Sequence, residues 1–459
     1  MKHFRRHALA LAIGAVVALR AAAADKPDPA QELKQLHDSM AAMQARMQAL
    51  EEALKARPDQ GMSEEQARQL GRVTVRGEGL EDAIESQGLK SLKISGWIEP
   101  VYLYSSGQRR AGPQFLDSAA NGEYAIDNGA FGGALLDFQK DFENGARWHF
   151  TFMPNRAGGG VAIDGQSVVH EASVSYPLGD LQTRLLAGQI PDWSGDEFLV
   201  APQNKLVTHN LLFDFTIPAV YTGAGMEVVR GNWDTKFLLA NVNASKRHPD
   251  ERAPAIVLRE DYYKGEFSGV GFAGVYGKAS NFRAAGANPV TGQAYPTRDS
   301  LLRLFEVDGY FIRGDWTLTG QLGVGGQKDA AISADPVTGE LRDSRWWGAT
   351  GLVAWKLRPR LELVARADYF HDRANGGGAL GYTVADGRSG LGPDPAGDPN
   401  IGADRRALSL GVRFAADANF TFKSELRLDS ANLPVFQDAV SGRMRHTNQI
   451  FATSVVMAF

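Results

Sequence analysis

Beyond about residue 90, apolar and polar residues alternate with a period of two, which is typical of β-strands with one apolar face. Around residue 150, Trp148 and Phe150 occupy one face, and Arg147 and His149 occupy the other. The alternation is clearest in four segments: 145–153, 361–370, 420–429 and 451–459. Because soluble sandwiches alternate in the same way, this pattern predicts strands without deciding how they are arranged.

The connections between the strands favour a barrel. Turns with hairpin chemistry recur at seven places: Glu143-Asn144-Gly145, Pro177-Leu178-Gly179-Asp180, Arg230-Gly231-Asn232, Gly265-Glu266-Phe267, Arg313-Gly314-Asp315, Arg358-Pro359-Arg360 and Ala416-Asp417-Ala418. Longer segments rich in Gly, Pro, Asp and Asn separate these hairpins, at roughly 105–129, 155–166, 191–218, 243–254, 280–299, 326–343, 372–403 and 430–446. With a first strand from Leu92 and a last strand from Thr447, the count is sixteen strands.

An even number of strands, with short turns at one rim and long loops at the other, is typical of bacterial outer-membrane proteins. We therefore predict an all-β fold over residues 91–459, a 16-stranded antiparallel transmembrane β-barrel. Pro100 breaks the ladder of the first strand and is expected at a bulge or an edge position. Both termini then lie on the short-turn side, which is the periplasmic side.

The N-terminal region follows other patterns. Residues 1–24 combine a basic start, an apolar run and small residues before Asp25, which is typical of a secretory signal peptide. The apolar run, from Ala8 to Leu19, is shorter than the roughly 20 residues that a membrane-spanning helix needs. The alternative is a buried N-terminal helix.

Residues 25–58 have a helical period. Apolar residues recur in steps of three and four, at Leu33, Leu36, Met40, Met43, Met47, Leu50 and Leu54. This spacing predicts a periplasmic coiled coil that self-associates, although an amphipathic helix lying on its own domain would have the same pattern. Met at three seam positions leaves the number of helices open. Residues 59–90 are predicted to form a linker.

Composition narrows the chemistry. The 459 residues include 49 Lys and Arg, 53 Asp and Glu, and no Cys. Without Cys there are no disulfides, thiolate zinc sites or cysteine nucleophiles. The near-neutral net charge gives no support to a nucleic-acid partner.

Several motifs carry no chemistry in their context. Residues 269–274 match GxGxxG, but a strand-like segment follows where a dinucleotide site needs a helix. His170-Glu171 and His371-Asp372 are not accompanied by GxSxG or HExxH. The loop carboxylates Asp394, Asp398 and Asp404 do not have the spacing of an EF-hand. We therefore predict no catalytic residue, metal site or cofactor.

If the lumen is aqueous, what narrows it decides which solutes pass. The third long loop, 191–218, has the length to fold inward, and its candidate constriction residues are Asp192, Asp196, Glu197, Lys205 and His209. Strand parity places further charges in the lumen as pore-wall candidates: Arg147, Glu171, Arg184, Lys236, Glu362, Arg366, Asp368, Lys423, Glu425 and Arg427. An acidic loop facing basic wall residues would set a transverse field across the passage. Alternatively, these residues are merely solvated in a wide lumen, and their mixed signs predict weak ionic selectivity.

Three stretches carry a resemblance to known families: GLKSLKISGWIEPVYLY, AFGGALLDFQKDFENGARWHFTFMPNR and LLAGQIPDWSGDEFLVAPQNKLVTHNLLFDFTIPAVYTGAGMEV. From about Gly88 to Phe459 the chain resembles an uncharacterised proteobacterial family of porin-like proteins, related to the β-barrel porin superfamily. The terminal Phe459 after an alternating strand resembles the assembly signal of outer-membrane barrels. A coiled coil ahead of a barrel resembles phosphate-selective porins, but the strands show no dense basic ladder.

The resemblance implies passive transport through a trimeric pore and assigns no substrate. We expect a multi-pass protein of a Gram-negative outer membrane that lets small hydrophilic solutes or ions diffuse. Its expected partners are outer-membrane lipid and two further copies of the chain, joined through barrel and coiled coil. The alternatives are an outer-membrane barrel hydrolase and a soluble periplasmic or secreted β-protein that binds a small ligand.

Overall fold

The computed structural model describes residues 91–107, 109–115, 132–153, 168–244, 254–281, 286–295, 299–331, 334–373 and 402–459. The predicted signal peptide, coiled coil and linker lie outside the described residues, as do Asp394, Asp398 and the predicted loop 155–166. Lys93–Phe459 form one compact unit, and this unit contains the barrel from the second residue of its first strand onward.

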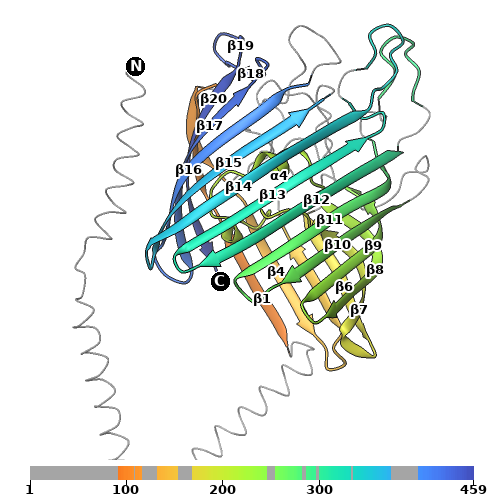
Figure 1. The fold of residues 1–459 in the computed structure, drawn as a ribbon, viewed down its shortest axis with the longest axis vertical. Coiled ribbons are helices and arrows are strands. Elements are labelled where there is room, and N and C mark those ends of the chain that lie inside the picture. The colour runs from red at the N-terminus through yellow and green to blue at the C-terminus, as the bar shows by residue number, and fades with distance from the viewer. Residues whose placement is uncertain are drawn as a thin grey trace, which may run out of the picture. The chain divides into compact units, whose positions relative to one another are not determined.

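The described strands close into a 16-stranded antiparallel β-barrel, as the sequence predicts (Figure 1). The strands are β1 (Leu92–Ile98), β2 (Val101–Ser105), β3 (Arg110–Gln114), β4 (Ala134–Asp141), β5 (Arg147–Phe152), β6 (Val169–Leu178), β7 (Asp180–Pro191), β8 (Val220–Arg230), β9 (Trp233–Val242), β10 (Ala255–Tyr263), β11 (Ser268–Ser280), β12 (Asp299–Arg313), β13 (Trp316–Gln327), β14 (Ser344–Arg358), β15 (Leu361–Asp372), β16 (Asp404–Ala415), β17 (Phe420–Ala431) and β20 (Thr447–Ala458). A small hairpin, β18 (Phe436–Gln437) and β19 (Met444–Arg445), forms a separate sheet.

The last strand closes the ring. β20 pairs with β17 on one side and with β1 and β2 on the other. Two of the barrel strands are each made of two pieces. β1 and β2 are separated at Glu99 and Pro100, where the sequence predicts a disturbed ladder, and they pair with β4 and β3 respectively.

The connections agree with the predicted turns. All seven predicted short turns join consecutive antiparallel strands, and Figure 1 shows hairpin turns gathered at one rim. Gly145 and Gly231 have φ of 78° and 59°, a backbone conformation that glycine adopts without steric cost. The predicted first long loop, 105–129, is wrong at its start. There the chain turns within a few residues and forms β3, because Tyr102 and Leu103 find pairing partners in Pro113 and Gly112.

The two faces of the barrel wall differ in chemistry. Along β14 the alternation is regular: Trp346, Leu352 and Ala354 are buried, whereas Trp347, Val353 and Trp355 are exposed. Neighbouring strands likewise expose large apolar side chains, among them Leu239, Ile256, Tyr276, Phe305 and Leu322. An apolar outer surface of this kind is what a membrane barrel presents to lipid. None of the described helices has the length and apolar character to span a bilayer.

Candidate functional site in the barrel lumen

The connection between β7 and β8 folds into the barrel. We call residues 192–219 the inner loop; it contains a 3₁₀ turn at Ala201–Gln203 and the helix α4 at Leu211–Phe215. Asn210 caps this helix by accepting a hydrogen bond from the backbone N–H of Phe213 at 2.8 Å. All five residues of α4 are buried, so the inner loop is a packed element of the interior.

Apolar contacts hold one side of the inner loop against the wall. Leu211, Phe213 and Phe215 belong to a buried cluster with inward residues of β8–β12 and β14–β16. The rings of Phe215 and Phe370 lie 5.5 Å apart, and Leu206 packs on Leu352, Ala354 and Val364. Burial of this apolar surface stabilises the inward position of the inner loop by roughly 25 cal/mol per Å².

A charged wall holds the same side through hydrogen bonds. We call Glu362, Arg366 and Asp368 of β15 and Lys423, Glu425 and Arg427 of β17 the anchoring wall. Arg366 is 1 % exposed; it donates to Glu197 Oε1 at 2.7 Å and to the carbonyl oxygen of Thr208 at 2.7 Å. Asp368 in turn accepts from Arg366 Nε at 3.2 Å.

The other members of the anchoring wall also bind the inner loop, Glu425, Lys423 and Arg427 through its backbone and Glu362 through the side chain of Lys205. Glu425 accepts the N–H groups of Val207 and Thr208 at 2.9 and 2.7 Å. Lys423 donates to the carbonyl oxygen of Ala201 at 2.7 Å, and Arg427 donates to that of His209 at 3.0 Å. Glu362 accepts a hydrogen bond from the side chain of Lys205 at 2.7 Å. Charge-assisted hydrogen bonds of this kind are stronger than hydrogen bonds between neutral groups.

These contacts differ from the expected transverse field. The sequence pattern suggests an acidic loop that faces basic wall residues across water, but Glu197 and Arg366 are in direct contact. Glu197 also accepts the N–H of Asn210 at 2.6 Å. The charged side chains of the anchoring wall therefore bind the inner loop and do not face a solute across water.

The titratable groups of the inner loop have shifted pKa values because they are buried. Burial raises the pKa of Asp192 to about 7, although Ser194 and the hydroxyl of Tyr221 donate to its carboxylate. Burial and the neighbouring Glu197 raise the pKa of Asp196 to about 7. Burial lowers the pKa of His209, which stacks on Phe213, to about 3, so this imidazole is neutral.

Three basic wall candidates have local partners instead. Arg147 pairs with Asp141 at 2.6 Å, and its side chain is 50 % exposed. Arg184 donates to the carbonyl of Gly145 at 2.7 Å. The third, Lys236, pairs with Asp234 at 2.8 Å and Glu227 at 3.4 Å.

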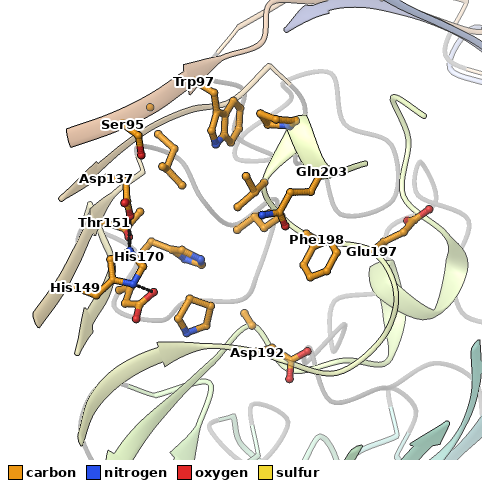
Figure 2. A pocket seen from close by; sticks show the side chains of 18 of the residues that line it. Ser95, Trp97, Asp137, His149, Thr151, His170, Asp192, Glu197, Phe198 and Gln203 are labelled. Carbon is orange, nitrogen blue, oxygen red and sulfur yellow. Dashed lines mark hydrogen bonds and ion pairs between the residues drawn. The ribbon is translucent and has the colours of Figure 1, made fainter. Parts of the chain in front are cut away.

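The opposite side of the inner loop borders open space. A cavity of about 440 Å³ lies between the inner loop and strands β1 and β4–β6 (Figure 2). Its polar side, which we call the β4–β6 wall, consists of Asp137, Gln139, His149, Thr151, His170 and Glu171. The pore-wall candidate Glu171 and the loop candidates Asp192 and Glu197 line this cavity.

His149 joins the two carboxylates of the β4–β6 wall. Its Nδ1 lies 3.0 Å from Glu171 Oε2, and its Nε2 forms a short contact with Asp137 Oδ1. A neutral imidazole donates from only one nitrogen. Because both ring nitrogens face carboxylate oxygens, this arrangement fits the imidazolium form.

The inner loop and β1 supply the apolar side of the cavity. Phe198, Phe213 and Ile217 line it from the inner loop, and Trp97 lines it from β1. Figure 2 shows Trp97 and Phe198 on the side of the cavity away from His149. The cavity thus has one apolar, aromatic side and one acidic side.

Sequence reasoning missed Asp137, Gln139, Trp97 and His149 as lining residues. The alternation does put His149 and Thr151 on the face opposite Trp148, and that face turns inward. His170 lines the cavity for a different reason. The pairing between β5 and β6 shifts register at Thr151 and Phe152, so that His170 is an extra residue beside Glu171.

Comparison with known families assigns the chain to a protein family. The model of the family DUF3138, proteins of unknown function, matches residues 60–459. The chain belongs to this family. No curated protein sequence matches the chain significantly.

Solved structures share the fold of this DUF3138 protein. Outer-membrane expressed OmpT of Vibrio cholerae is 9% identical, with a TM-score of 0.50, over 80% of this chain and 97% of that chain. OprB of Pseudomonas putida is 10% identical, with a TM-score of 0.50, over 83% of this chain and 97% of that chain. The anion-selective porin from Comamonas acidovorans is 11% identical, with a TM-score of 0.48, over 80% and 99%. At these identities the likeness to OmpT and OprB extends to the fold alone.

Proposed function

We propose that this DUF3138 protein is an outer-membrane porin that lets small hydrophilic solutes diffuse passively. The observation that carries the proposal is a 16-stranded barrel whose inward-folded loop leaves a cavity of about 440 Å³ beside the wall. A barrel of this size is wide enough for an aqueous lumen unless side chains or loops fill it. The apolar outer surface and the similarity to outer-membrane barrels support a location in the outer membrane.

The finer parts of the proposal concern placement and assembly. We expect the barrel in the outer membrane of a Gram-negative bacterium, with the short turns and the N-terminus in the periplasm. We also expect a homotrimer, with the N-terminal coiled coil assisting the assembly. Crosslinking of outer-membrane preparations tests the trimer, and protease protection of the N-terminal region in intact cells tests the orientation.

The proposed passage lies between the inner loop and the β4–β6 wall, and Asp192 and Glu197 line it together with Asp137 and Glu171. Lys205 and the anchoring wall act by keeping the inner loop in place. The other basic wall candidates, Arg147, Arg184 and Lys236, pair locally. Neutralising Asp192, Asp196 and Glu197 together is expected to shift ion preference toward anions. An unchanged reversal potential would contradict a constriction role for these carboxylates.

No covalent chemistry is proposed for the cluster around His149. A hydrolase needs a nucleophile hydrogen-bonded to its base. Ser173 donates to Glu171 at 2.5 Å, and Thr151 donates to Asp137 at 3.0 Å while lying 3.4 Å from His149 Nε2. Both hydroxyls are thus directed to carboxylates, and we expect an esterase and peptidase panel to detect no activity.

Planar-bilayer recording tests the porin proposal. Full-length protein extracted from outer membranes should insert and give discrete, stable conductance steps. Heat-modifiable migration on a gel confirms that the same preparation contains a folded barrel. A heat-modifiable barrel that never conducts would contradict the proposal.

A further inference from the structure

The cavity beside the β4–β6 wall has a lining suited to a particular kind of solute. Its lining residues include the carboxylates of Asp137 and Glu171 and no Lys or Arg among the described residues. In the imidazolium form that its contacts fit, His149 balances one of these two carboxylates. Glu197 adds a carboxylate paired with Arg366, and Asp192 adds one that ionises near neutral pH. The cavity therefore favours positive charge.

A second observation is independent of the carboxylates. Trp97 is 4 % exposed, and its indole Nε1 has no hydrogen-bond partner among the described residues. Figure 2 shows this nitrogen turned toward the cavity. A buried donor without an acceptor is unfavourable and rare in folded proteins. A solute oxygen in the cavity would satisfy it.

The third observation is the aromatic surface that the inner loop presents to the cavity. Phe198 and Phe213 line the cavity on the inner loop, and Ile217 and Pro218 extend the apolar side. Phe198 is 47% exposed, so its ring is available for contact. Apolar sides with a few placed polar groups are typical of small-molecule sites of this volume.

We propose that this cavity is a binding subsite for small organic amines that carry an apolar ring and one acceptor oxygen. The ammonium group binds at Asp137 and Glu171, the ring packs on Phe198 and Phe213, and the oxygen accepts from Trp97 Nε1. This inference rests on the proposed porin function and names the class of solute that the passage favours. No covalent step is involved.

Calorimetry on the detergent-solubilised full chain tests binding without requiring conduction. The probes are tyramine and 4-hydroxyphenylacetate, which share the phenol ring and carry opposite charges. Tyramine should bind at least about tenfold more tightly, because its ammonium forms hydrogen bonds with ionised acceptors. Equal affinity of the two probes, or tighter binding of the anion, would overturn the proposal.

Two variants separate the contributions. Asp137→Asn with Glu171→Gln should weaken tyramine binding about tenfold or more, whereas the matched control Glu227→Gln, which removes a carboxylate outside the cavity, should not. Trp97→Phe should weaken tyramine binding about fivefold and leave phenethylamine, which lacks the oxygen, unchanged. If the double variant fails to show heat-modifiable folding, the Trp97→Phe result and the two-probe comparison decide.

Bilayer recording with the same probes separates this inference from the porin proposal. If the channels open, and tyramine reduces their conductance whereas 4-hydroxyphenylacetate does not, the result would support both the porin function and the amine subsite. Open channels that treat the two probes alike would overturn the amine subsite and leave the porin standing. A silent barrel that binds tyramine selectively in solution would overturn the porin function and leave the subsite as a binding site.

Discussion

Two parts of the barrel interior carry similar residues and differ in what covers them. The anchoring wall on β15 and β17 and the β4–β6 wall both place alternating charged side chains inward. Arg366 and Arg427 of the anchoring wall are 1% and 0% exposed because the inner loop lies on them. On the β4–β6 wall, the side chain of His149 is 25% exposed and borders the cavity.

The comparison shows that an inward charge on a barrel strand can have either of two roles. Where the chain covers it, the charge is desolvated and must be satisfied by the covering backbone, as Glu425 is by Val207 and Thr208. Where a cavity borders it, the charge is available to solutes. Position on a strand alone does not distinguish the two.

Removing an anchor from the covered wall should have the largest effect. Arg366→Met leaves Glu197 buried without its cation, and breaking a buried pair costs about 3–5 kcal/mol. We expect the gel transition to unfolded barrel at a lower temperature and noisy, larger conductance steps. Arg230→Met, which breaks an exposed pair with Asp180, should change neither quantity.

Glu425→Gln should have the next largest effect. The amide keeps one acceptor oxygen but loses the charge that binds two backbone N–H groups, at a cost of about 1.5–3 kcal/mol. Thermal unfolding followed by gel shift measures the loss. A loss no greater than that of Glu227→Gln, whose carboxylate is 23% exposed, would contradict the assigned role of the covered wall.

The pH dependence of ion preference should reveal the titration of Asp192 and Asp196, the carboxylates of the inner loop for which the described residues show no ion pair. Burial raises the pKa of Asp192 and Asp196 to about 7, so both are protonated in acid and ionise as pH rises through 7. Because their folded-state pKa is raised, their favourable contribution to the seated loop is present in acid and lost above pH 7. We expect cation preference, measured as reversal potential in a KCl gradient, to rise between pH 5.5 and 8.5. Asp192→Asn with Asp196→Asn should flatten this rise, and a rise that survives would show that other groups cause it.

The smallest effect on stability is expected on the open wall. Gln139→Ala removes hydrogen bonds to Asp137 and His149, but Asp137 keeps Thr151 and His149 as partners. We expect a change in unfolding free energy within about 0.5 kcal/mol and a modest rise in conductance. A loss as large as that of Glu425→Gln would break the distinction between the two walls.

The barrel could be predicted from the sequence because its signals are local. Each short turn carries its own chemistry, as at Gly145 and Gly231, and each strand carries its own alternation. The broken first strand could be predicted from Pro100, which has no N–H to donate. The short turn before β3 was missed, because the Gly- and Pro-containing residues near it have the composition of a loop.

The cavity could not be predicted because its walls come from distant parts of the chain. Glu197 and Arg366, which determine where the inner loop lies, are 169 residues apart. The parity of a strand places a side chain inside, as for His149, but says nothing of what lies across from it. The segment Leu211–Phe215, in which four of five residues are apolar, is a signal that this loop packs inside, and the charges of the loop alone do not reveal it.

Thiol accessibility tests the account most directly, because the chain has no Cys and every introduced thiol is the sole one. Gln139→Cys lines the cavity, whereas Ser409→Cys lies beside Arg366 under the inner loop and is 0 % exposed. In bilayers, a cationic methanethiosulfonate reagent should reduce the current through Gln139→Cys and leave Ser409→Cys unaffected. Block at Ser409→Cys with none at Gln139→Cys would place the passage on the other side of the inner loop and contradict the account.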